Sequence, residues 1–403
     1  MFKELKNKKI RDWCLFDFAI SSYPTLIITF IYGAFYAKEI ALTPEIGTSN
    51  WGYAISVGSV VSFFLFLILL LTGNKKKNIG IEFFRLPFYL LILFVSALFF
   101  FDKASNEYFP LFFVAISLVC FEILNLFYNL SLHNVAERKK RGLISNLGWA
   151  TGYLGGLLSL ITVLILLNIT KSYDYKLLGQ SIFLLLGPFV GIWTLIFGLK
   201  HINNFQNIVF KIDNLVIFLK NIKTNNINRF LISYFFFNNS VICIFAFASM
   251  IASFLFDFSE AEILKLGIFI NLAGIVGCLL LGKIEDKTGS EKIVIVCIIF
   301  LMFITTTLYF TNSTTIFWVL SLMIGFFIGP IQAASRSVIA KRMMAKSQLS
   351  AFCVYSMFGN VCSILGPFLV SLVISVTSDI RQGLLVIPIF FFISLIFLFK
   401  PNA

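Results

Sequence analysis

Charged residues are scarce in this sequence: Asp, Glu, Lys and Arg make up 13% of its 403 residues, about half the share of an ordinary globular domain. Only two histidines are present, and no polar stretch is long enough to form a separate catalytic domain. By contrast, 59% of the residues are hydrophobic and 50 are Phe. So few charges could not cover a water-soluble fold of this size, and we expect an integral membrane protein.

Several catalytic signatures are also missing. The sequence has no GxxxxGK[ST], HExxH or GxSxG, which argues against ATP-driven transport by this chain alone and against standard hydrolase chemistry. The seven cysteines include no CxxC pair and lie in or beside apolar runs, so we interpret them as packing residues without metal or disulfide roles. The basic N-terminus lacks a small-residue cleavage site, and we expect it to be retained. We therefore predict no enzyme activity and no cofactor.

Apolar runs separated by polar segments predict twelve membrane-spanning helices of about 20 residues each. The longest polar segment, residues 200–228, divides them into two sets of six. The predicted fold class is all-α integral membrane, with two six-helix halves at 1–199 and 229–403 joined by a cytoplasmic linker at 200–228. The spans are expected near residues 15–41, 51–73, 84–101, 108–132, 144–169, 180–199, 229–256, 262–282, 292–311, 314–339, 351–376 and 382–399.

The basic residues predict the orientation. Of the 32 Lys and Arg residues, 26 lie on the side of the predicted spans that includes both termini and the linker. By the positive-inside rule that side is cytoplasmic, so we expect a multi-pass protein of the inner (cytoplasmic) membrane with both termini inside. This distribution explains the net charge of +13 without a nucleic-acid partner.

Two acidic residues, Asp17 and Glu122, fall inside predicted spans. A charge at the centre of a membrane helix costs about 2.5–3.5 kcal/mol on insertion scales, so such residues tend to be functional or to have a fixed partner. Glu122, Asn125 and Asn129 follow helical steps of three and four and share one face. This stripe is consistent with a path for a proton or a polar substrate. The alternative is an interhelical hydrogen-bond seam, at about 0.6 kcal/mol per bond.

Polar stripes on several other spans suggest a shared central cavity, although each alone is also compatible with helix packing. The predicted substrate-binding or proton-binding residues are Glu122, Asn125, Asn129, Asp17, Trp149, Tyr153, Asn238, Asn239, Gln332 and Asn360.

The loop between spans 8 and 9, residues 282–289 (GKIEDKTG), resembles the GxxxD[RK]xG loop of the major facilitator superfamily. In that superfamily the Asp helps to hold the cytoplasmic gate through contacts with helix ends and charged groups. The resemblance assigns Asp286 and Lys287 to a gate, and we add Arg336 to it from its position near the end of span 10. The matching loop of the first half, residues 73–77, lacks the acid.

Three further segments resemble the vacuole-effluxer-like family within that superfamily. Residues 12–19 (DWCLFDFA) are similar to its DWxLYDFANS opening, residues 141–156 (RGLISNLGWATGYLGG) to its RxxSxxGWAxGYLGG segment, and residues 332–337 (QAASRS) to its QAxSRS element. The order along the chain also agrees.

The resemblance implies a twelve-helix secondary transporter that works by alternating access, and fungal members are linked to amino-acid export from the vacuole. This chain departs from the family pattern where Ile20 replaces an Asn and Asn239 stands at a common Asp in span 7. Without that span 7 acid, Glu122 and Asp17 are the main proton candidates.

We hypothesise a secondary transporter for a small polar metabolite such as an amino acid, in which Glu122 titrates or binds a cationic group. Coupling to a proton gradient is part of this hypothesis. Its expected partners are a small-molecule substrate and membrane lipid, and we expect a monomer. Three alternatives come from other classes: a membrane-embedded enzyme, an ion channel, and a receptor or scaffold with a degenerate transporter fold that binds a ligand without moving it.

Overall fold

The computed structural model describes residues 2–71, 78–80, 82–102, 106–173, 182–204, 209–211, 227–343 and 347–399. Within these ranges twelve helices are long and apolar enough to cross a membrane, which confirms the predicted all-α class. The elements, with short 3-10 and π segments labelled η, are η1 (Phe2–Lys6), α1 (Lys8–Ile20), η2 (Pro24–Phe30), α2 (Tyr32–Phe35), η3 (Tyr36–Ile40), α3 (Pro44–Leu71), β1 (Asn78–Gly80), α4 (Glu82–Ala97), η5 (Leu98–Phe100), α5 (Tyr108–Val135), η6 (Arg138–Lys140), α6 (Arg141–Tyr173), η7 (Ile182–Leu185), α7 (Leu186–Asn204), β2 (Val209–Lys211), α9 (Ile227–Phe256), α10 (Glu260–Thr288), α11 (Ser290–Phe310), α12 (Thr314–Arg342), α13 (Gln348–Thr377), α14 (Ile380–Leu384) and α15 (Val386–Phe399).

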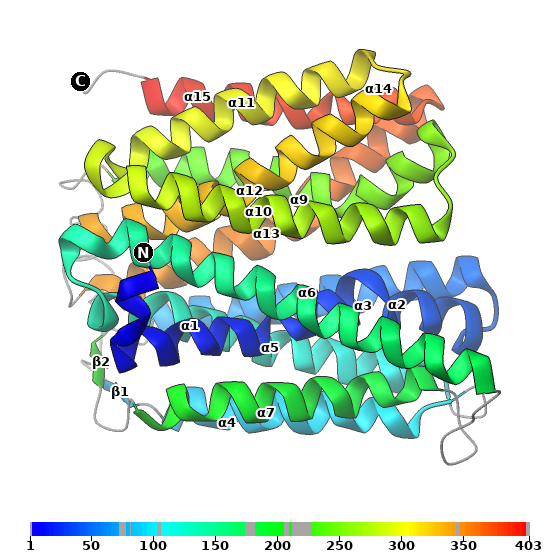
Figure 1. Cartoon of the computed structure of the whole chain (residues 1–403), viewed down its shortest axis with the longest axis horizontal. Coiled ribbons are helices and arrows are strands. Elements are labelled where there is room, and N and C mark those ends of the chain that lie inside the picture. The colour runs from blue at the N-terminus through cyan, green and yellow to red at the C-terminus, as the bar shows by residue number, and fades with distance from the viewer. Residues whose placement is uncertain are drawn as a thin grey trace.

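The helices form two bundles, α1–α7 and α9–α15, which lie side by side with their helices running roughly along the long axis of the molecule (Figure 1). Both termini and the strands lie at the same end of the molecule, which we call the linker end. The bundles contact each other mainly through α6 against α10 and α12, and through α3 against α13. The first half thus supplies two long helices to the interface between the halves, and the second half supplies three.

The linker region differs from the prediction in two details. Helix α7 continues to Asn204 and α9 begins at Ile227, so the segment between them is shorter than residues 200–228. Part of this segment, Val209–Lys211, forms an antiparallel pair with Asn78–Gly80 from the loop after α3. Hydropathy did not predict this small sheet, because three-residue strands carry no periodicity of their own.

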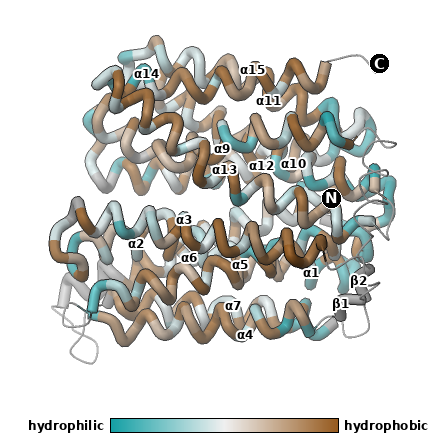
Figure 2. Tube along the Cα trace, turned by 180° about the vertical axis from the view of Figure 1, so that it is seen from behind, coloured by the Kyte–Doolittle hydropathy of each residue, from teal (hydrophilic) through white to brown (hydrophobic). Residues whose placement is uncertain are grey.

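The helices are apolar along most of their length, and polar residues gather toward their ends (Figure 2). Large hydrophobic side chains such as Phe64, Phe303 and Phe392 are more than half exposed on the surface of the bundles. In water such a large apolar surface would promote aggregation, whereas in a membrane it faces lipid.

Close packing of α1 against α6 depends on Gly155. A Cβ at this position would fall against the main-chain carbonyl oxygen of Phe18 on α1. Because a carbonyl within a helix cannot turn away without breaking the helix, Gly155→Ala should force α1 and α6 apart. We expect a loss of about 1–3 kcal/mol in stability.

Gly52→Ala on α3 is the matched control, because a Cβ there would meet no atom within 4 Å. Since Ala is the better helix former by about 1 kcal/mol, this variant should be as stable as the parent or more so. The thermal unfolding midpoints of the two purified variants in detergent test the prediction. Equal midpoints would show that α1 and α6 can separate without cost.

Candidate functional site

Arg336 of α12 extends from the second half into the first half at the linker end. Its Nε donates to Ser145 Oγ at 2.9 Å, and its Nη2 donates to the Ser145 carbonyl oxygen at 2.7 Å. Nη1 donates to Asn129 Oδ1 at 3.3 Å. Only 2% of Arg336 is exposed. The guanidinium therefore joins α12 to both α5 and α6.

Two aromatic rings of the first half contact this guanidinium. Its carbon lies 5.0 Å from the Trp13 ring centroid and 4.7 Å from that of Tyr128. The two rings stack at 4.3 Å, and Trp13 Nε1 donates to the Tyr128 carbonyl oxygen at 3.0 Å. Cation–π attraction is stronger for a desolvated cation such as this one. Gly148 leaves the space for both rings, because a Cβ there would overlap them.

Asp286 of α10 caps the N-terminus of α6. Its carboxylate accepts hydrogen bonds from the main-chain N–H groups of Gly142 at 3.0 Å and Leu143 at 2.9 Å. A helix N-terminus favours negative charge, so this contact is electrostatic as well as geometric. Lys341 of α12 lies 2.9 Å from the same carboxylate. Asp286 thus connects one helix of the first half with two of the second.

The neighbouring Glu285 is fully buried and adds a second carboxylate to the interface. Its Oε2 accepts from Asn146 Nδ2 at 2.5 Å, and its Oε1 accepts from Ser290 Oγ at 2.6 Å. Lys341 Nζ lies 3.9 Å from Glu285 Oε1. We call the set formed by Arg336, Asp286, Glu285 and their partners the linker-end contact, since it holds the two halves together at that end.

Two of the three predicted gate residues take part in the linker-end contact, and the third does not. Arg336 and Asp286 both take part in the linker-end contact. Lys287 is exposed on the last turn of α10. The lysine that contacts Asp286 is instead Lys341, which lies 55 residues further along the chain.

Glu122 and Asn125 lie near the middle of α5, and both are half-buried. The structure gives the Glu122 carboxylate no hydrogen bond or ion pair within the residues it describes. Electrostatic interactions link it to Tyr23 of the first half and to Tyr234 of the second. Among the residues that the structure describes, Glu122 is therefore an acid without a hydrogen-bond or ion-pair partner.

The predicted residues of α9 and α12 separate into two groups. Gln332 Nε2 donates to Asn238 Oδ1 at 2.9 Å, which joins α12 to α9 within the second half. Asn239 points elsewhere: its Nδ2 donates to the Phe235 carbonyl oxygen at 2.7 Å and contacts Cys362 Sγ at 3.0 Å. Asn239 thus takes part in packing of α9 against α13.

Asp17 lies on α1 beside Gly152 of α6, and Trp149 and Tyr153 lie on α6. The Asp17 carboxylate accepts from Ser21 Oγ at 3.4 Å and also interacts electrostatically with Arg336. The rings of Trp149 and Tyr153 lie 5.8 Å apart. A Cβ at Gly274 of α10 would lie 2.9 Å from the Tyr153 ring, so this ring crosses to the second half.

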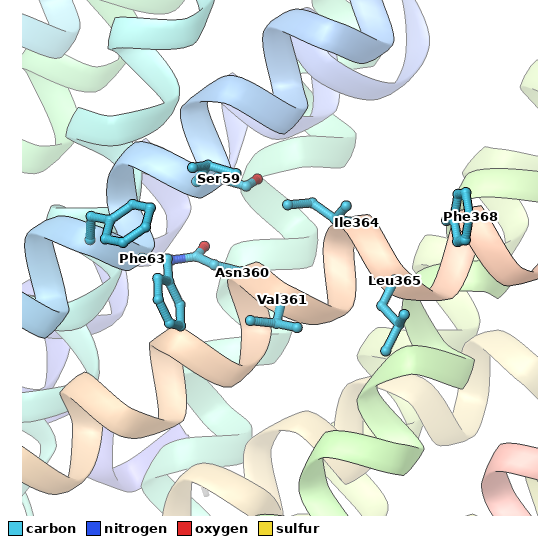
Figure 3. Close-up of a pocket in the computed structure, with 9 residues that line it drawn as sticks. Ser59, Phe63, Asn360, Val361, Ile364, Leu365 and Phe368 are labelled. Atoms are coloured by element: carbon cyan, nitrogen blue, oxygen red, sulfur yellow. The ribbon is translucent and has the colours of Figure 1, made fainter.

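Asn360 lies at a groove of about 290 Å³ between α3 and α13 (Figure 3). The side chain points from α13 toward α3, and its Nδ2 is buried with no hydrogen-bond partner in the described parts of the chain. Most of the remaining lining is apolar, and it consists of Ser59, Val60, Phe63, Phe64, Val361, Ile364, Leu365 and Phe368. Asn360 therefore retains a free donor at the seam between the halves.

Sequence reasoning missed several residues of the linker-end contact, among them Trp13, Tyr128, Ser145 and Glu285. Tyr128 lies three residues after Asn125 and so belongs to the same helical stripe, which could have drawn attention to it. Glu285 lies next to Asp286 in the GKIEDKTG motif, and nothing local in the sequence distinguishes it from an exposed acid. Its burial depends on Asn146, which is 139 residues away.

Comparison with known proteins supports a single family. The family model described as "Vacuole effluxer Atg22 like" matches residues 128–402. An uncharacterized MFS-type transporter of Bacillus subtilis, YxiO, is 25% identical over 417 residues, covering 98% of this chain and 95% of that protein. Autophagy-related protein 22 of Pichia angusta is 24% identical over 289 residues, covering 59% of this chain and 51% of that protein.

Solved structures share the fold. A bacterial homologue of the iron transporter ferroportin in an outward-facing state matches with a TM-score of 0.72 at 11% identity, covering 98% of both chains. The proton:xylose symporter XylE matches with a TM-score of 0.69 at 11% identity, covering 99% of this chain and 95% of that one. The fold, the matched residues and the relatives agree that this chain belongs to the vacuole effluxer Atg22-like family of major facilitator superfamily transporters.

Proposed function

We propose that this transporter carries amino acids across the cytoplasmic membrane by alternating access. The observation that carries the proposal is Glu122, an unpaired and half-buried carboxylate in the middle of a spanning helix. Because a lone charge at this depth costs about 2.5–3.5 kcal/mol, it needs a cationic partner from outside the protein. A proton or the ammonium group of a substrate meets that need.

The second half offers groups suited to the other end of an amino acid. Gln332 Nε2 uses one N–H on Asn238, and its second N–H remains available to a carboxylate. Tyr234 of the same half lies within electrostatic range of Glu122. A zwitterion would place its ammonium group on Glu122 and its carboxylate on Gln332. Glu122 would repel a simple anion.

We further propose that the linker end faces the cytoplasm, as 26 of the 32 basic residues suggest. The linker-end contact would then be the cytoplasmic gate, and the described state would be closed on that side. Both halves of the site come from one chain, so we propose that the monomer is the transporting unit.

Counterflow into proteoliposomes that contain the purified protein tests the proposal. The vesicles are loaded with one unlabelled amino acid at a time, and uptake of the same labelled amino acid is followed with and without a pH gradient. We expect saturable exchange of at least one zwitterionic amino acid, and faster exchange when the gradient drives protons across with it.

Sugars and dicarboxylates in the same vesicles serve as controls for substrate class, because neither offers a cation to Glu122. Exchange of these solutes without any amino-acid exchange would reject the proposed substrate class. Saturable binding of amino acids in detergent without any counterflow would favour a receptor over a transporter.

A further inference from the structure

We propose that His133 is a proton-binding site at the linker end. Its contacts hold the two halves together only while the His133 Nδ1 atom is unprotonated. His133 lies in the last turn of α5 and is half-buried. Two groups contact its Nδ1: Arg141 Nη2 of α6 at 2.5 Å and Gln348 Nε2 of α13 at 2.8 Å. The imidazole therefore bridges the first half and the second half.

The chemistry of the two partners fixes the role of Nδ1. A guanidinium has no acceptor, so Arg141 can only donate. Gln348 Nε2 also faces the carbonyl oxygens of Ala340 at 3.1 Å and Met343 at 3.3 Å, so its nitrogen rather than its oxygen must point this way. Nδ1 accordingly accepts, and a neutral His133 carries its proton on Nε2.

Protonation of Nδ1 would oppose both contacts. The new N–H would face two donors, and the imidazolium would place a positive charge beside Arg141. Arg141 belongs to the interface itself, because its Nη1 donates to the Ala340 carbonyl oxygen at 2.5 Å. One proton would thus weaken two contacts between the halves, the one between His133 and Gln348 and the one between Arg141 and Ala340.

The charges around His133 do not offset this effect. Arg141 is the charged group that faces it from α6, and Arg138 of η6 adds a further positive charge near Arg141. From the second half, α12 and α13 present the Ala340 and Met343 carbonyls and the Gln348 amide. The nearby cations of α12 are directed elsewhere, Lys341 to Asp286 and Arg342 to Glu291.

The inference depends on the transporter fold and not on the proposed substrate. Histidine changes its charge between pH 5 and 8, so the opening of the linker end should respond in this range. We expect the ratio of closed to open linker ends to fall about tenfold on going from pH 8 to pH 5.5, which corresponds to the loss of a hydrogen bond to a charged group.

Distance measurements between two spin labels test the inference on the full chain in nanodiscs. Lys139→Cys on η6 and Lys292→Cys on α11 place one label on each half at exposed positions of the linker end. The seven native cysteines are buried, so the added pair is labelled selectively. We expect a longer distance population to grow at pH 5.5.

The matched variant is His133→Gln, whose side-chain oxygen can accept from Arg141 and Gln348 at any pH. It should keep the short distance at both pH values. Glu122→Gln should still show the shift, which separates this site from the proposed substrate site. A shift that persists in His133→Gln, or one that disappears in Glu122→Gln, would overturn the inference.

A second readout is independent of the labels. The chain has two histidines, so ring-labelled ¹⁵N-histidine gives two sets of signals, and His133→Gln identifies one of them. We expect the His133 signals at pH 8 to show an unprotonated Nδ1 and a protonated Nε2. The opposite tautomer would contradict the assigned hydrogen bonds.

Discussion

Arg336→Gln should open the linker end and abolish most of the exchange activity. The variant loses the hydrogen bonds to Ser145 and the cation–π contacts with Trp13 and Tyr128. It also leaves the acceptors Ser145 and Asn129 without their donor. Removing one partner from a buried charged cluster typically costs about 3–5 kcal/mol.

Since every 1.4 kcal/mol is about a factor of ten, this loss corresponds to a shift of roughly a hundredfold to several thousandfold toward the open linker end. Such a shift would reverse the populations of the two states, and a transporter trapped on one side cannot complete a cycle. Arg336→Lys should restore little, because an ammonium cannot reproduce the planar set of donors.

The label pair at Lys139 and Lys292 measures this opening directly. The matched control is Arg85→Gln, which removes another guanidinium, one that pairs with the exposed Glu82 within helix α4. Pairs of this kind within one helix contribute little, so Arg85→Gln should leave both the distance and the exchange rate unchanged. If Arg336→Gln keeps the short distance, then Asp286 and Glu285 hold the halves together without it.

Glu122→Gln should lower amino-acid exchange by about 10- to 100-fold at a fixed substrate concentration. The reason is the loss of a charge-assisted contact with the ammonium group, which contributes about 1.5–3 kcal/mol. The same variant should no longer respond to an imposed pH gradient, because glutamine cannot bind and release a proton. We expect the loss to appear mainly as a higher KM.

The stability of Glu122→Gln separates a transport role from a structural one. A neutral amide avoids the insertion cost of a mid-membrane charge, so its unfolding midpoint should equal or exceed that of the parent. Glu82→Gln, an exposed acid at the start of α4, is the matched control and should change neither quantity. A destabilised but active Glu122→Gln would identify Glu122 as a packing residue.

The sequence predicts the spans well because hydropathy is a local property. The first predicted span, 15–41, is displaced because the helix begins at Lys8, where charged residues extend it beyond the apolar layer. Glu122 was equally accessible to prediction, since an acid in the middle of an apolar run needs no partner to be recognised.

The contacts between the halves could not be predicted in the same way. Arg336 meets Asn129 from 207 residues away, and no spacing rule connects two such positions. Asn129 illustrates the difficulty: its helical stripe is visible in the sequence, whereas its bond to Arg336 depends on how α12 lies against α5. The choice of Lys341 over Lys287 as the partner of Asp286 likewise depends on the packing of α10 against α12.

The small sheet between β1 and β2 affects how the two halves are tethered. By pairing Val209–Lys211 with the loop after α3, it fastens the start of the connecting segment to the first half. The covalent connection to the second half therefore leaves the first half beside β1 and the loop after α3, and not at the end of α7. Two loops of the first half, one after α3 and one after α7, thus share a single anchoring point at the linker end.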